Sequence, residues 1–157
     1  MRVYVMRHGP AEDDALSGRD ADRALTPNGR QRVRNVAQEL ARRAETPRLV
    51  LSSPLVRALQ TAEIVAALTN PEEGVAIQPA LSPGGDLRRL LDALLRQGAR
   101  RVMIVGHEPD LSGLVTALVP GLGPPSLDKA MVVGLRLHEG AAPERRFVLS
   151  PKDLAWS

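Results

Sequence analysis

The sequence predicts an α/β fold: a three-layer sandwich in which a mostly parallel sheet carries helices on both faces and ends in an antiparallel edge. Fully apolar strand segments alternate with amphipathic helical segments, a pattern typical of parallel sheets covered on both sides. The last two strand segments follow one another without a helix, which favours an antiparallel edge. The chain has 157 residues, 43% hydrophobic and 25% charged, as expected for one globular domain spanning residues 1–157.

Glycine, proline and capping residues mark where the first two strands and helices begin and end. Residues 2–6 form an apolar strand, which a Gly-Pro pair ends before a polar loop. Residues 26–44 begin with Thr-Pro and carry apolar residues at three- and four-residue spacing, which predicts a capped helix. Residues 49–51 form the second strand, and Ser52-Ser53-Pro54 is expected to cap and start the second helix.

The second half of the chain repeats this alternation before it changes. A weaker strand precedes a helix that Asp86 can cap and that carries a stripe of leucines. A third apolar strand, a fourth helix and two final strands follow. The expected segments are strands 75–78 and 102–105, helices 86–95 and 111–119, and strands 131–137 and 147–150.

Composition excludes several functional classes. The absence of cysteine removes disulfide scaffolds, cysteine zinc sites and thiol catalysis, and it favours a reducing compartment. Aromatic residues make up 2% of the chain, too few for stacking a row of bases, so no nucleic-acid partner is expected. No segment approaches the roughly 20 apolar residues of a membrane span, and the apolar run Val3–Met6 is too short for a signal peptide. We therefore expect a cytoplasmic protein without a membrane partner.

Chemistry-bearing residues collect where three predicted strands end. Arg7-His8-Gly9 follows the first strand, Ser53 to Arg57 follows the second, and Gly106-His107 follows the strand at 102–105. Ligands of open α/β sheets bind at the carboxyl ends of the strands, so these residues are expected to share one edge. Arg57 falls in the first turn of a helix, where the dipole repels a cation, and it therefore needs an anion. Helix N-termini bind phosphate, so the pattern points to phosphate chemistry.

Residues 3–10, 25–29, 52–62 and 105–110 together resemble the histidine phosphatase superfamily, which carries an Arg-His-Gly signature. The short length and residues 81–86 look most like its SixA phosphohistidine phosphatase family. The resemblance covers nearly the whole chain. It implies a phosphoglycerate-mutase-like sandwich in a minimal version, without an inserted lid.

The resemblance also implies roles for four residues and needs no metal or cofactor. His8 would be the nucleophile, forming a phosphohistidine intermediate that water hydrolyses. It would have to be neutral, with its other ring nitrogen donating to a backbone carbonyl. Arg7 and Arg57 would hold the phosphoryl oxygens, and His107, if protonated, would add a third positive contact.

Five further residues are weaker candidates. Gly9, Ser53 and Arg23 are expected to line the substrate site, although Ser53 also suits a helix cap and Arg23 a loop ion pair. Asp86 and Glu108 are candidates for a general acid, although each also suits the N-terminus of a helix.

The expected substrate is a phosphohistidine-bearing protein of a phosphorelay or phosphotransfer system. Relatives that act on esters usually carry an acid and a lid near the third strand, for which residues 75–86 leave no room. Imidazole leaves with less acid catalysis than an alkoxide does. The alternatives are a phosphatase of a small phosphate ester or sugar phosphate, and a non-catalytic phosphate-binding module. A metal site built on His8 and His107 lacks further histidine or cysteine ligands.

Overall fold

Six strands form one sheet in the order β3-β2-β4-β1-β5-β6 in the computed structural model, which describes all residues from 1 to 157. Strands β1 to β4 run parallel, whereas β5 pairs antiparallel with β1, and β6 pairs antiparallel with β5. The strands are β1 (Arg2–Arg7), β2 (Leu49–Ser52), β3 (Val75–Ile77), β4 (Arg101–Gly106), β5 (Val132–Arg136) and β6 (Glu144–Leu149). The predicted parallel sheet with an antiparallel edge is confirmed.

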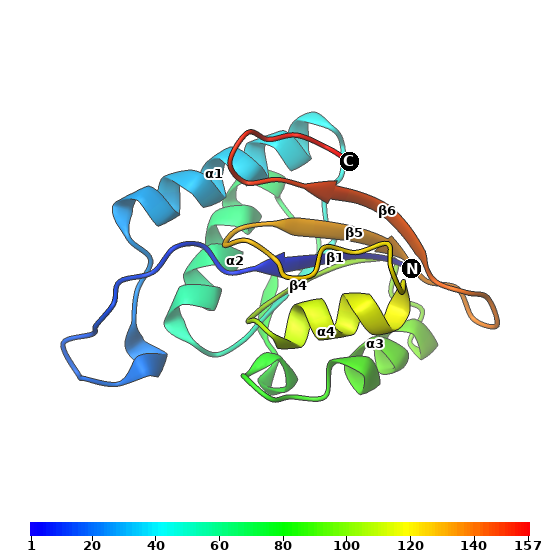
Figure 1. Cartoon of the computed structure of the whole chain (residues 1–157), viewed down its shortest axis with the longest axis horizontal. Coiled ribbons are helices and arrows are strands. Elements are labelled where there is room, and N and C mark those ends of the chain that lie inside the picture. The colour runs from blue at the N-terminus through cyan, green and yellow to red at the C-terminus, as the bar shows by residue number, and fades with distance from the viewer.

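Helices cover both faces of the sheet, α1 and α2 on one side and α3 and α4 on the other (Figure 1). They are α1 (Pro27–Arg42), α2 (Val56–Thr69), α3 (Leu87–Arg96) and α4 (Asp110–Leu118), with short 3₁₀ turns η1 (Asp20–Asp22) and η2 (Pro79–Leu81). The predicted three layers are therefore confirmed. None of the helices has the length and apolar character that crossing a membrane requires.

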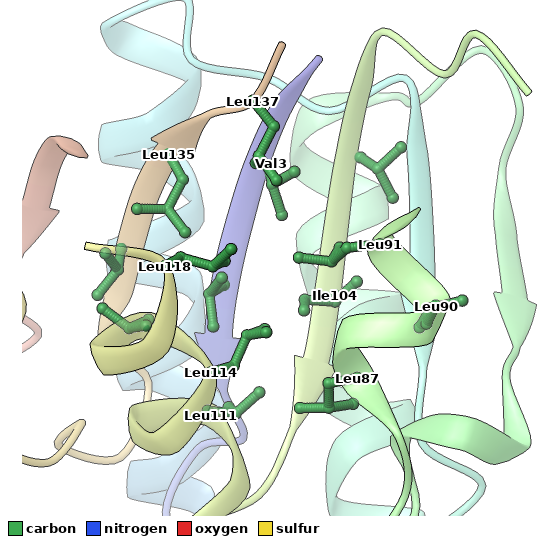
Figure 2. Packing of buried hydrophobic residues seen from close by; sticks show 14 of the residues in the cluster. Val3, Leu87, Leu90, Leu91, Ile104, Leu111, Leu114, Leu118, Leu135 and Leu137 are labelled. Atoms are coloured by element: carbon green, nitrogen blue, oxygen red, sulfur yellow. The ribbon is translucent and has the colours of Figure 1, made fainter. Parts of the chain in front are cut away.

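The buried middle residues of the central strands β1 and β4 are hydrophobic because both faces of these strands are covered. In β1, Val3 and Val5 belong to the cluster under α3 and α4, whereas Tyr4 and Met6 belong to the cluster under α1 and α2. Figure 2 shows leucines of α3 and α4 beside Val3 and Ile104. Burial of each such side chain contributes about 1.5–3 kcal/mol. This double packing holds β1 and β4, and with them the residues at their carboxyl ends.

Two helices start where the sequence predicts. Thr26 Oγ1 accepts a hydrogen bond from the backbone N–H of Gly29 at 2.8 Å, and Pro27 is the first residue of α1. Asp86 Oδ1 accepts one from the N–H of Arg89 at 3.0 Å, one residue ahead of α3. Both predicted caps are confirmed, since each depends only on residues within one helical turn.

The predicted start of the second helix is wrong. α2 begins at Val56, with Leu55 as an N-cap that makes no side-chain bond. Ser53 lies ahead of the helix, and its Oγ accepts a hydrogen bond from Leu55 N at 3.2 Å. The chain therefore makes a turn before the helix starts, and this turn places the Ser53 hydroxyl in contact with His107. Arg57 remains in the first turn of the helix.

Strand β6 begins at Glu144, earlier than the predicted start at Phe147. Its first residues are charged, which hides the strand in the sequence pattern. An edge strand tolerates such residues because they reach solvent or a partner at the rim. Here Arg146 donates two hydrogen bonds to Glu45, at 2.7 and 2.6 Å.

Gly29 has no side chain and therefore lets the chain after His8 pass close to α1. A Cβ at Gly29 would overlap the carbonyl oxygen of Pro10, which also accepts a hydrogen bond from Thr26 N at 3.1 Å. We expect Gly29→Ala to lower the free energy of unfolding by about 1–3 kcal/mol, measured by urea denaturation, because backbone must move. In α4, Gly113→Ala meets nothing within 4 Å and should raise it by about 0.5–1 kcal/mol. The same sign for both variants would contradict this explanation.

Candidate active site

Two histidines lie side by side at the carboxyl end of the sheet. β1 and β4 are neighbours, with Arg7 opposite Gly106, so the residues that follow them are His8 and His107. The N–H of His8 donates to the carbonyl of Gly106 at 3.2 Å. The two ring centroids are 5.2 Å apart. The structure thus brings together the two histidines that the sequence places at separate strand ends.

His8 presents a lone pair to the site. Its Nδ1 lies 2.7 Å from the carbonyl oxygen of Gly9, which can only accept, so Nδ1 carries the proton and Nε2 the free lone pair. The side chain is buried, and burial lowers its pKa to about 3, with the positive charges of Arg57 and Arg7 acting in the same direction. His8 is therefore a neutral, oriented base at neutral pH.

Three buried nitrogen atoms around these rings have no hydrogen-bond partner in the protein. They are Nε of Arg7, Nε of Arg57 and Nδ1 of His107. The terminal nitrogens of the arginines are held in place: Arg7 Nη1 donates to the carbonyl of Leu127 at 2.8 Å, and Arg57 Nη1 to that of Asp20 at 3.0 Å. Buried donors without acceptors are rare and costly. A phosphoryl group, with several acceptor oxygens and negative charge, fits this set.

His107 is neutral in this structure. Burial is the largest cause that lowers its pKa to about 4, and Arg57 adds to it. The free protein therefore does not supply the protonated ring that a third positive contact from His107 would require. The ring keeps a proton only on one nitrogen, and its Nε2 lies 2.8 Å from Ser53 Oγ.

Asp20 supplies the anion that Arg57 needs in the first turn of α2. Its Oδ2 lies 3.2 Å from Arg57 Nη2, and its Oδ1 accepts from Arg23 Nε at 2.9 Å. The hydrogen bond from Arg23, with the charge of Arg57, holds the pKa of the Asp20 carboxyl below its ordinary value. Asp20 lies on η1, in the loop that projects from the end of the sheet after β1 (Figure 1). Nothing in the sequence distinguishes it from the other carboxylates of this loop.

Gly9 makes room for α1. A Cβ there would lie 2.6 Å from Val33 Cγ2, and its N–H already donates to Thr61 Oγ1 at 3.1 Å. Thr61, a buried residue of α2 that was not a predicted site residue, in turn donates to the carbonyl of Arg57 at 2.8 Å. These contacts tie the strand end that carries His8 to the helix that carries Arg57.

The remaining candidates have structural partners. Arg23 forms the expected loop ion pair with Asp20. Asp86 caps α3, and Glu108 Oε1 accepts from the N–H of Ser112 at 3.0 Å in the first turn of α4. Both carboxylates thus serve helix N-termini, as their alternative interpretations predict. Between β3 and α3 there is only the short turn η2, so no insertion covers the site.

The site around His8 and His107 lies away from two of the large cavities. Cavities of about 460 and 480 Å³ are lined by Arg48 and Arg100, at the amino ends of the strands, opposite His8. No group of three or more His, Cys, Asp and Glu residues is placed to hold a metal ion. The site is an open arrangement of charged and polar groups, suited to phosphate.

Comparison with known proteins agrees with this geometry. A sequence model of the histidine phosphatase superfamily (branch 1) matches residues 3–82. Phosphohistidine phosphatase SixA of Escherichia coli is 34% identical over 157 residues, which cover 98% of this chain and 96% of that protein. This chain belongs to the histidine phosphatase superfamily.

Two further comparisons match almost the whole chain. A structure of the protein histidine phosphatase SixA complexed with tungstate has a TM-score of 0.89 and 34% identity, covering 99% of this chain and 100% of that one. An uncharacterized protein of Picosynechococcus sp. is 40% identical over 147 residues, covering 90% of this chain and 87% of that protein. The expected phosphoglycerate-mutase-like fold without a lid, and the resemblance to SixA, are confirmed.

Burial of the two histidines predicts how the stability of this histidine phosphatase depends on pH. Their folded pKa values, about 3 and about 4, lie below the ordinary 6.5. Unfolding therefore takes up protons below pH 6.5, and stability falls as pH falls toward the folded values. When the pH is lowered from 7 to 5, each histidine should reduce the free energy of unfolding by about 2 kcal/mol. We expect His107→Gln to remove one of these contributions.

The measurement is urea denaturation at both pH values for the wild-type protein and His107→Gln. This window lies above the pKa of carboxyls such as Glu39, which is lowered to about 2 by its hydrogen bond from Arg42. If the two proteins lose the same stability between pH 7 and pH 5, His107 is not buried as a neutral ring.

Proposed function

We propose that this protein is a phosphohistidine phosphatase that removes the phosphoryl group from a phosphohistidine displayed on another protein. One observation carries the proposal. His8 keeps a free lone pair on Nε2, in a site where buried nitrogen atoms of Arg7, Arg57 and His107 have no hydrogen-bond partner. This set combines a nucleophile with groups that bind phosphoryl oxygens.

The reaction proceeds in two steps. His8 Nε2 attacks phosphorus, and the bond between phosphorus and the substrate imidazole breaks, leaving a phosphohistidine on His8. The departing imidazole takes up a proton from water, which reaches the open site. Water then attacks the phosphorus on His8, which releases inorganic phosphate and restores the neutral ring. Arg7, Arg57 and His107 hold the phosphoryl oxygens through both steps, because phosphoryl transfer depends on positioning and charge stabilisation.

Two features support a phosphohistidine over an ester. An alkoxide leaving group needs a strong proton donor, and the expected acids Asp86 and Glu108 both accept backbone hydrogen bonds at helix N-termini. The site also has no covering insertion, so a histidine on a protein surface can reach His8. The similarity to the E. coli protein named phosphohistidine phosphatase SixA points the same way.

The proposed substrate protein is of the phosphorelay or phosphotransfer type. Such a partner can present its phosphohistidine on its surface, because no insertion between β3 and α3 covers the site of this chain. The cytoplasmic location expected from the cysteine-free sequence stays a prediction, as does the interpretation of residues 1–157 as one domain.

A substrate panel tests the proposal directly. Turnover of a phosphohistidine-bearing protein should exceed that of phosphoserine and of sugar phosphates, and His8→Ala should abolish it. Arg57→Gln should lower kcat by about 10²–10³-fold, because one oxyanion-stabilising group is lost. Rapid quenching followed by mass spectrometry at alkaline pH should find the phosphoryl group on His8.

His138→Ala is the matched control, since His138 is the third histidine of the chain and is exposed at the other end of the sheet. It should keep wild-type turnover. Faster turnover of a small ester would replace the proposal with the ester phosphatase. Phosphate binding without turnover or labelling of His8 would replace it with a binding module.

A further inference from the structure

The Ser53 hydroxyl is a buried group that the mechanism above does not use. Ser53 is completely buried at the end of β2, ahead of α2. Its Oγ has two hydrogen-bonding contacts, the backbone N–H of Leu55 at 3.2 Å and His107 Nε2 at 2.8 Å. It thus connects the start of α2 to the ring beside His8.

The number of hydrogens available at Ser53 determines which group donates in its hydrogen bond with His107. The Leu55 N–H can only donate, so it uses one lone pair of Ser53 Oγ. If neutral His107 carried its proton on Nε2, that N–H would also donate to Oγ, and the Ser53 hydrogen would be left in the interior without an acceptor. If the proton is on Nδ1, the Ser53 hydroxyl donates to Nε2, and every group at Ser53 is satisfied.

We propose that Ser53 is a positioning residue that keeps the proton of neutral His107 on Nδ1 and thereby presents this N–H to the phosphoryl group. The Nδ1 atom is buried and has no acceptor within the protein. A phosphoryl oxygen is the acceptor that it lacks. The catalytic part of this inference rests on the function proposed above.

The two histidines then share one tautomer and present opposite groups to the substrate. In His8 the carbonyl of Gly9 takes the Nδ1–H, which leaves a lone pair to attack phosphorus. In His107 the Ser53 hydroxyl occupies the Nε2 lone pair, which leaves an N–H to hold an oxygen. Without Ser53, His107 would be free to present a lone pair to the substrate oxygens, which repel it.

The charged groups around His107 do not determine which of its ring nitrogens carries the proton. The ring is faced by His8, which follows β1, and by charged groups on Arg7 of β1, Arg57 of α2, Asp20 of η1 and Asp110 of α4. None of them makes a hydrogen bond to either ring nitrogen of His107. Ser53 is therefore the group that distinguishes the two nitrogens.

The test measures the tautomer of His107 and the turnover number separately. Protein labelled with ¹⁵N-histidine gives ring-nitrogen NMR signals that distinguish Nδ1–H from Nε2–H in the free protein at pH 7. We expect His107 to be Nδ1–H in the wild-type protein and a mixture of tautomers in Ser53→Ala. The kcat of Ser53→Ala should fall about 3- to 10-fold, less than the about 10²–10³-fold expected when a stabilising donor is removed entirely.

Two variants separate positioning from packing. Ser53→Thr keeps a hydroxyl and should restore the Nδ1–H tautomer and most of the turnover. Ser52→Ala removes the neighbouring buried hydroxyl, which donates to the carbonyl of Ser53 at 2.8 Å and does not contact His107. It should leave the tautomer unchanged.

The outcomes distinguish this inference from the proposed function. An Nε2–H tautomer in the wild-type protein, or the same tautomer in wild type and Ser53→Ala, overturns the inference. A changed tautomer with unchanged kcat overturns the catalytic part of it. If no substrate is turned over while the tautomer still depends on Ser53, the proposed function fails, and Ser53 keeps its positioning role toward bound phosphate alone.

Discussion

Burial of two neighbouring histidines in fixed orientations is the constraint on which the rest of the site depends. The register of β1 and β4 places His8 and His107 side by side, and the surrounding chain removes both rings from water. A buried imidazole stays neutral near pH 7, so it offers one lone pair and one N–H. Local hydrogen bonds then determine which of the two faces the substrate. The carbonyl of Gly9 does this for His8.

Permanent positive charge comes from arginine, which does not lose its proton. Arg7 and Arg57 are held by backbone carbonyls, so their guanidinium groups stay in place without a bound substrate. The carboxylate of Asp20 balances Arg57 from the outside, where it remains largely exposed to water. A phosphoryl group therefore binds to arginines that are already in position. In the free protein, Asp20 keeps the buried Arg57 from being an unpaired charge.

The packing of the sheet explains why this arrangement is stable. β1 and β4 are buried on both faces, with α1 and α2 against one side and α3 and α4 against the other. This packing on both faces holds the residues at the carboxyl ends of β1 and β4 in place. Close contacts then link the elements: Gly9 lets α1 approach β1, and Thr61 joins Gly9 to the backbone of Arg57. Each of these contacts needs a small or short side chain at one position.

Local rules were enough to predict several elements from the sequence. The caps at Thr26 and Asp86, the apolar strands and the placing of Arg7, His8 and His107 at strand ends each depend on residues within a few positions. The start of α2 was not predicted correctly, because Ser53 makes a turn with Leu55 and a contact with His107, which is 54 residues away. A distant partner of that kind leaves no local signal.

Sequence patterns alone predicted the fold class, the edge of the sheet that carries the site and the residue types gathered there. Periodicity and strand-end motifs are local properties, and they suffice for those conclusions. Only the tertiary structure showed that Asp20 pairs with Arg57, that burial lowers the pKa of both histidines and that Ser53 contacts His107. Desolvation and hydrogen-bond partners depend on segments that are far apart in the chain and meet only when it folds.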